Sequence, residues 1–262
     1  MNATSLAPPE VPRFTGGGVL VVGLLLVLCA PLGLYKLWRR RAGYGVIIPY
    51  AVVGLPVFLV LYTFIGIVGF AAFLPDLNLS VAAGAPRTVR FARGNYESTF
   101  LETARDTQGA HELIRVQIQP KGGNSAHYHR QFEETFTLLE GELTVELPGK
   151  SIVLKTGESV TAQRGDMHWF HNPGATVTTM TVRVTPARGL EKSIRVAYGL
   201  DGAGMLSTGT RTQNMWRYVL MLGYSESYLP GMPSVIQEPL VKSLARIAQW
   251  LGKDEELKVF FG

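Results

Sequence analysis

The segment from His127 to Asn172 constrains the fold most, because it places metal-binding side chains at the spacing of β-strands. His127 and His129 form an H-x-H pair, and side chains two residues apart lie on one face of a strand. His168 follows a Gly-Asp turn, where a hairpin could carry it back over the first pair. The segment therefore predicts donor side chains that converge from several strands.

Alternation along the next strand distinguishes two adjacent glutamates. Glu134 shares its face with Phe136 and Leu138, whereas Glu133 shares its face with two threonines. A face that carries large apolar side chains is the buried one. We therefore expect Glu134 to point inward.

The same parity sorts the later histidines. His168 falls on the face of Phe170, and His171 falls on the opposite face with Trp169. His171 is therefore expected to be structural or to support a ligand. Three imidazoles and one carboxylate would suit a divalent transition metal such as manganese, iron, nickel, copper or zinc, with positions left for water or substrate.

The first half of the segment resembles the first motif of the cupin family. That motif runs from a glycine through H-x-H and a glutamate to a second glycine, and His127, His129, Glu134 and Gly141 match it. Gly122 stands one residue too close to the pair.

The second half resembles the second cupin motif. Gly157, Gly165, His168 and Asn172 match it, and Gln163 stands where the family has proline. Both departures fall in turns. The resemblance implies a jelly-roll barrel, and it assigns the metal-ligand positions to His127, His129, Glu134 and His168.

Short strand-like runs punctuated by glycine and proline predict an antiparallel β-fold over residues 87–200, independently of the metal motif. Residues 76–86 are expected to be a linker. The predicted strands are Thr88–Ala92, Leu113–Gln119, Glu134–Leu147, Ser151–Leu154, Val177–Thr185 and Lys192–Ala197. The predicted fold class is an all-β jelly-roll barrel with an N-terminal two-helix transmembrane hairpin and a helical C-terminal extension.

Two charge-free apolar runs precede the barrel, after a polar tail over residues 1–13 that is expected to be disordered. The run 14–35 is long enough at about 1.5 Å per residue to cross a hydrocarbon core of roughly 30 Å. A cleaved signal peptide is the alternative, but only Arg13 precedes the run, and basic residues follow it directly. The second span is expected over 47–73, because prolines are tolerated in membrane helices.

Positive charge between the two runs predicts their orientation. The tail before them carries one basic residue, whereas the short connecting loop carries Lys36, Arg39, Arg40 and Arg41. Short loops with this bias stay in the cytoplasm. We expect a multi-pass protein of the cell membrane, with both termini and the barrel on the extracytoplasmic side.

The net charge of +5 does not indicate a nucleic-acid partner. Residues 1–44 hold five basic side chains and one acid, and the remainder is nearly balanced, with 20 basic and 19 acidic residues. The expected partners are the lipid bilayer, a small-molecule ligand or substrate and, as a further alternative, a second copy joined through the barrel.

The C-terminal residues 201–262 predict a helical, amphipathic extension. Pro239–Leu251 places Leu240, Leu244, Ile247 and Leu251 at helical spacing, and Pro239 with Gly252 marks plausible ends. Two interpretations remain open: a helix that covers the barrel, and a helix that lies on the membrane surface.

Function is less constrained than fold. By resemblance, the site would bind an oxygenated small molecule, as in dioxygenases, decarboxylases and isomerases. The alternatives are a binding or sensing module without turnover, and a metal that only stabilises the barrel. The sequence identifies no catalytic residue outside the metal ligands, and His111 is expected to be solvated.

Overall fold

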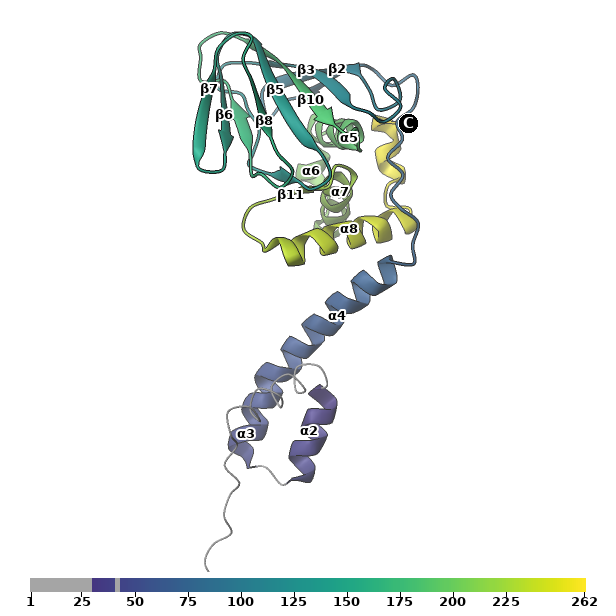
Figure 1. Cartoon of the computed structure of the whole chain (residues 1–262). Helices are drawn as coiled ribbons and strands as arrows, with labels where there is room; N and C mark the ends of the chain where they lie inside the picture. Colours follow the sequence, from purple (N-terminus) through teal and green to yellow (C-terminus); the bar gives the residue numbers. More distant parts are fainter. Residues whose placement is uncertain (1–29, 41–42) are drawn as a thin grey trace, which may run out of the picture. The chain divides into compact units, whose positions relative to one another are not determined.

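The structure is a computed structural model that describes residues 30–40 and 43–262 (Figure 1). The chain separates into two compact units, Met1–Gly66 and Ile67–Gly262. The predicted tail over 1–13 and most of the first predicted span, residues 14–29, lie outside the described residues.

The first unit is helical. Helix α2 covers Ala30–Arg39, and a longer helix is assembled from α3 (Tyr44–Pro49), a π-helical turn (Tyr50–Gly54) and α4 (Leu55–Ala71). The wide turn directly follows Pro49, whose missing N–H interrupts the regular bonding of a helix. Among the described residues, Tyr44–Ala71 is the one helix long and apolar enough to cross a membrane. Within residues 30–40 and 43–262 the structure therefore shows one candidate span and does not show the predicted two-helix hairpin.

The second unit contains antiparallel sheets of the jelly-roll kind. The largest has the order β1-β2-β3-β10-β5-β8, so that strands far apart in the sequence become neighbours. Its strands are β1 (Thr88–Phe91), β2 (Tyr96–Glu102), β3 (Glu112–Ile118), β10 (Thr178–Thr185), β5 (Glu133–Glu140) and β8 (Ser159–Ala162). The prediction missed β2 and β8.

Two smaller sheets complete the strand arrangement. One has the order β7-β6-β9, and the other pairs β11 with β4. Their strands are β7 (Lys150–Leu154), β6 (Leu143–Leu147), β9 (Trp169–His171), β11 (Ser227–Tyr228) and β4 (Tyr128–His129). The sheets do not close into a single barrel, which corrects the expected closed barrel. Where the histidine-bearing segments meet, the pairing is short: β4 has only two residues, and His127 and His168 meet only in an isolated bridge.

A glycine divides the predicted strand Glu134–Leu147. Gly141 has φ +90°, a conformation that disfavours other residues, and it separates β5 from β6. The chain thereby leaves the large sheet and enters the three-stranded one. Apolar side chains from both sheets, such as Phe136, Leu138 and Val145, then form one buried core. Each such burial stabilises the fold by about 1.5–3 kcal/mol.

Residues Lys192–Ala197 form a helix, which corrects the predicted strand. They lie in α5 (Leu190–Gly202), which is covered on two sides. Leu190 and Tyr198 join the core of the sheets, whereas Val196 and Leu200 join a second core among the helices. A helix buried on both sides lacks one continuous polar face, so its period is hard to read from the sequence.

The C-terminal region is helical, as predicted. It comprises α6 (Met205–Thr208), α7 (Arg211–Tyr224), α8 (Ser234–Trp250) and a 3₁₀ helix (Glu255–Phe260), and α8 lies at the foot of this unit in Figure 1. Helix α8 begins before Pro239, which corrects the expected start. Gly252, with φ +67°, follows its end as expected.

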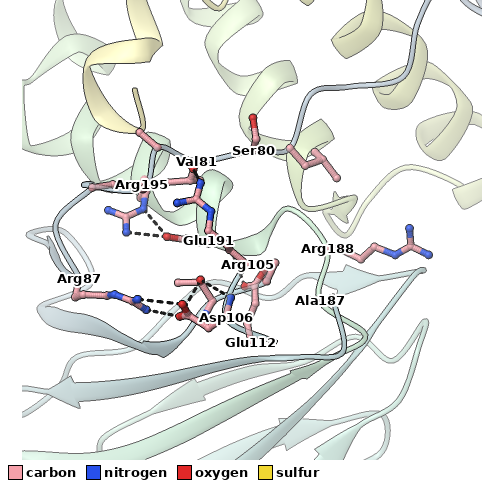
Figure 2. A pocket seen from close by; sticks show the side chains of 16 residues that line it. Ser80, Val81, Arg87, Arg105, Asp106, Glu112, Ala187, Arg188, Glu191 and Arg195 are labelled. Carbon is pink, nitrogen blue, oxygen red and sulfur yellow. Dashed lines mark hydrogen bonds and ion pairs between the residues drawn. The ribbon is translucent and has the colours of Figure 1, made fainter. Parts of the chain in front are cut away.

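Residues 76–86 form neither helix nor strand, yet they pack against the domain. The Lys192 ammonium donates a hydrogen bond to the Asn78 carbonyl at 2.6 Å, and the Ala82 N–H donates to the Phe261 carbonyl at 2.8 Å. Figure 2 shows Ser80 and Val81 of this segment beside a cavity near Arg195 and Glu191. The segment predicted as a linker is therefore packed against the helices of the domain.

Candidate metal centre

Four side chains predicted as ligands meet in the second unit. His127 and His168 face each other across the isolated bridge, His129 lies in β4, and Glu134 lies at the start of β5. One ligand atom from each lies within 4.8 Å of the others. Glu134 is buried, as parity predicted, and Phe170 and His168 are buried together while His171 is half-buried.

Each histidine is oriented by a bond at Nδ1. His127 Nδ1 donates to the Ser125 carbonyl at 2.8 Å, and His168 Nδ1 donates to the Asp166 carbonyl at 2.9 Å. His129 Nδ1 lies 3.3 Å from the Ser225 carbonyl, and its ring stacks on Phe132 with centroids 4.2 Å apart. Because a carbonyl only accepts, the proton sits on Nδ1, and Nε2 is the ligand atom.

The Nε2 atoms converge on the Glu134 carboxylate. Glu134 Oε2 lies 2.8 Å from His168 Nε2 and 3.9 Å from His129 Nε2. His129 Nε2 is buried and has no hydrogen-bond partner. A buried, unpartnered lone pair is costly unless something binds it. This orphaned nitrogen is the feature of the structure that fits a metal ion.

The charges of the cluster depend on burial and on the close contacts. Burial lowers the pKa of His129 to about 3, so this imidazole is neutral. Burial alone would raise the pKa of Glu134, but the hydrogen bond from His168 and the neighbouring histidines lower it to about 2. Burial opposes a charge on His168 too, yet its bond to Glu134 raises its pKa. Without metal, one proton is therefore held between His168 and Glu134.

The donor atoms of the four side chains, and their protonation states, fit the predicted divalent metal ion. Three imidazole nitrogens and a carboxylate suit a divalent transition metal, which would replace the proton on His168. The structure is compatible with such an ion, and ligation by each of the four residues stays a prediction.

The glutamine that replaces the motif's proline takes part in its turn. The Gln163 N–H donates to Asp166 Oδ2 at 3.0 Å, and the Asp166 N–H returns a bond to the Gln163 carbonyl at 3.0 Å. Proline has no N–H and could not donate the first bond. Asp166 also supplies the carbonyl that orients His168, so the turn positions a predicted ligand.

Two serines of the C-terminal extension contact the site, and the sequence pattern did not predict them. Strand β11 pairs with β4, which places Ser227 Oγ 3.2 Å from His129 Nδ1 and brings the Ser225 carbonyl to the same nitrogen. Ser225 and Ser227 are joined at 2.6 Å through their hydroxyls. No local pattern marks them, because Ser227 lies 98 residues from His129.

The remaining polar residues have structural roles. Asn172 is buried, and its side-chain amide donates to the carbonyls of Ile118 and Thr176. His111 is not simply solvated, since its Nε2 lies 2.6 Å from a Glu102 carboxylate oxygen.

A cavity of about 450 Å³ adjoins the cluster and is lined by both His127 and Glu134. Its walls are mostly apolar and include Phe136 and Phe170, two of the aromatic residues near the predicted ligands. Helices α5 and α7 contribute further wall residues, such as Tyr198 and Met221. The C-terminal extension therefore helps to shape the space beside the site.

The antiparallel sheets and the buried cluster of three histidines and one glutamate define a class of β-domains with a possible metal site. The family model of the cupin domain matches residues 114–183, which contain all four cluster residues. The match and the jelly-roll-like sheets support a cupin domain in this part of the chain.

Relatives match only in part. Germin-like proteins 3-5 and 3-6 of Oryza sativa subsp. japonica are each 36% identical over 78 residues, or 27% of this chain and 34% of each relative. The chain thus spans about a third of the length of these curated relatives.

Among solved structures, KdgF from Halomonas sp. is similar with a TM-score of 0.35 and 15% identity, covering 38% of this chain and 86% of that one. An RmlC-like cupin from Shewanella frigidimarina is similar with a TM-score of 0.35 and 18% identity, covering 43% of this chain and 95% of that one.

Proposed function

We propose that the cupin domain binds one divalent transition-metal ion through His127, His129, Glu134 and His168 and acts on a small oxygenated organic molecule in the adjoining cavity. The observation that carries this proposal is that the cavity of about 450 Å³ is lined by two of the four donors. Small-molecule sites typically have about this volume, with mostly apolar walls and a few convergent polar groups. A molecule in the cavity would therefore reach the metal directly.

The polar groups of the cavity suggest the kind of ligand. Ser98 Oγ and the Tyr198 hydroxyl lie 3.5 Å apart, and Tyr96 lines the same space. Burial raises the pKa of Tyr198 to about 12 and that of Tyr96 well above its ordinary range, so both phenols keep their protons at neutral pH. They can donate hydrogen bonds to oxygen atoms of a ligand whose apolar part contacts Phe136 and Phe170.

The chain's own residues would bind, orient and shield this ligand. Three imidazoles and Glu134 hold the metal, which when bound supplies Lewis acidity or the site of oxygen activation. The tyrosine hydroxyls orient ligand oxygens, and the aromatic walls exclude water. The reaction type would be dioxygenase, decarboxylase or isomerase chemistry.

One observation favours a second candidate, a binding or sensing module without turnover. Among the described residues that line the cavity, Asp201 is the only acid outside the metal cluster. It is held by Arg93 at 2.6 Å, so it is a poor general base. Catalysis would then depend on the metal ligands alone.

The two candidates are separated by assays on metal-loaded protein. Oxygen uptake and decarboxylation are measured over a panel of diketones, flavonols and dicarboxylates, with His168→Ala as the matched control. Turnover that is lost in the control supports an enzyme. A compound that raises the melting temperature without turnover supports the binding module by ligand linkage. Equal behaviour of both proteins with every compound would contradict a role for the cluster.

We also propose that the chain is a cell-membrane protein with its cupin domain on the extracytoplasmic side. The support is the apolar helix Tyr44–Ala71, together with the basic residues that precede it, among them Lys36 and Arg39. A C-terminal alkaline phosphatase fusion should be active and a green fluorescent protein fusion dark. The reverse pattern would place the domain in the cytoplasm.

A further inference from the structure

Helix α8 buries a narrow face of small and polar residues. Gln237, Ser243, Ala245 and Ala248 are buried, and α8 packs against α7. The two helices approach closely, because a Cβ atom added to Gly223 of α7 would overlap the Cβ of Ala245. The apolar stripe predicted at helical spacing includes Leu240, Leu244 and Ile247, and these three side chains are only half-buried.

Larger apolar side chains remain exposed along the same helix and the turn before it. Their exposed fractions are 47% for Met232, 76% for Val235, 44% for Ile236, 57% for Trp250 and 47% for Leu251. A helix that only covers a soluble domain shows the opposite arrangement, with its largest apolar side chains inward. Such a group of exposed apolar side chains marks an interaction surface.

The C-terminal half of α8 is attached to the end of the apolar helix. The Trp250 ring meets Phe70 of α4 edge-on, with centroids 5.6 Å apart. The Arg246 guanidinium donates to the Pro75 carbonyl at 3.0 Å and also to the Leu74 carbonyl, and it lies 3.2 Å from Asp76. Residues from Ile67 onward belong to the same compact unit as α8, so these contacts lie within one unit.

We propose that α8 lies on the phospholipid surface at the point where the apolar helix leaves the membrane, with Val235, Ile236 and Trp250 inserted at the level of the headgroups. This inference rests on the proposed membrane span. The end of a span lies at the interface, so a helix that touches its last turn lies at the depth of the headgroups.

The chemistry of the surface favours lipid over a protein partner. Aromatic side chains are enriched at membrane interfaces. Trp250, which contacts Phe70, is 57% exposed, and Phe73, just after the end of α4, is 90% exposed. Lys242 of α8 lies 3.8 Å from Glu226, yet its side chain is 52% exposed and can also approach lipid phosphates. Apolar side chains with neighbouring cations are the composition of helices that bind membrane surfaces.

The arrangement would hold the metal-site strand at a fixed height above the bilayer. Glu238 of α8 accepts hydrogen bonds from Arg130 at 2.7 Å and from the Tyr128 hydroxyl at 3.1 Å. Tyr128 neighbours His129 in β4. The surface helix therefore contacts the strand that carries a predicted ligand.

The test uses the full chain in vesicles of phosphatidylcholine and phosphatidylglycerol that contain brominated lipid. Cys29, the sole cysteine, is replaced by Ala, and a fluorophore is attached to Val235→Cys. Val60→Cys in the apolar helix is the positive control, and Val153→Cys in β7 is the negative control. These two valines are 71% and 67% exposed, so the labels fit without repacking. We expect quenching at position 235 to exceed that at position 153 by about twofold or more.

The outcomes separate this inference from the membrane span itself. Quenching at position 60, with position 235 no different from position 153, would overturn the surface helix and leave the span intact. Absence of quenching at position 60 would overturn both. The label at position 235 could instead show no lipid quenching and become inaccessible to solvent only at high protein density. That result would indicate a second copy as the partner and contradict the proposal.

Discussion

Two glutamates in one row of the large sheet differ in charge although both are buried. Glu112 in β3 and Glu134 in β5 are both Cα partners of Val184 in the strand between them. Their exposed fractions are 0% and 6%. The two carboxyl groups therefore have the same sheet, the same row and nearly the same burial, and they differ only in what surrounds them.

Two arginines of the cavity beside Glu112 are bonded to other carboxylates. Arg195 bonds Glu191 at 2.7 and 3.0 Å, and Arg87 bonds Asp106, as the dashed lines of Figure 2 show. Glu112 accepts a hydrogen bond from the Glu191 N–H at 3.1 Å, and its other oxygen has no partner. Burial, followed by the charge of Glu191, raises the pKa of Glu112 to about 8.

Around Glu134 the neighbours are histidines, which hold the pKa of this carboxyl at about 2. Burial alone therefore does not decide the charge of a carboxyl group. A buried acid among bonded arginines and another acid keeps its proton, whereas the same acid among imidazoles loses it. The surroundings of Glu134 combine a negative charge with an unpartnered imidazole nitrogen, so this site suits a cation, whereas the site of Glu112 does not.

The largest expected effect comes from removing a donor of the histidine cluster. His129→Ala or His168→Ala should weaken metal binding by about a thousandfold, because each leaves the ion short of a ligand. Elemental analysis and metal titration measure this. Glu112→Gln is the matched control and should keep its metal. Full occupancy in the His129 variant would place the metal elsewhere.

A second effect concerns pH. Glu134 stays ionised through the physiological range, whereas His168, whose pKa is raised, takes up a proton that the metal must displace. Metal affinity should therefore fall by about tenfold for each pH unit below the pKa of His168 and level off above it. Titration between pH 5 and pH 8 measures the slope. Glu112→Gln should show the same slope, and a flat profile would remove His168 from the ligand set.

The charge state of Glu112 can be tested through stability. Its folded pKa of about 8 lies above the ordinary value of 4.5, so the folded protein binds the proton more tightly than the unfolded chain. The free energy of unfolding should then fall as pH rises from 4.5 toward 8. Metal-free Glu112→Gln should lack this loss and gain about 2 kcal/mol over the wild type above pH 8.

Melting in detergent at the two ends of this pH range checks the prediction. The control is Glu140→Gln, at an exposed position of the same sheet, which should follow the wild type. A Glu112→Gln variant that loses stability equally at both ends would mean that the carboxyl group is needed in its charged form.

The smallest effect is expected at His171. It lies three residues after His168, but on the opposite face of the strand, where it pairs across to Thr144. His171→Ala should change metal affinity by about twofold or less. A loss as large as that in the His168 variant would show that the cluster is wider than the four residues described.

Local periodicity predicted much of the cluster. The H-x-H spacing and the alternation around Glu134 and His168 assigned the faces correctly, because side chains alternate along any strand whatever its neighbours. The cupin-like motifs and most long strands followed from the same short-range patterns. The helix at Lys192–Ala197 was missed because its burial on two sides hides the helical period.

Tertiary structure decided which groups meet across long separations. The support of His129 by Ser225 and Ser227, the contact of Glu191 with Glu112 over 79 residues and the outward side of α8 all depend on how elements pack. From its local pattern alone, the sequence indicated that Glu134 points inward and that three histidines share its motif. Whether a buried acid is charged was decided only by the fold, because pKa depends on neighbours in space and alternation depends on neighbours in the chain.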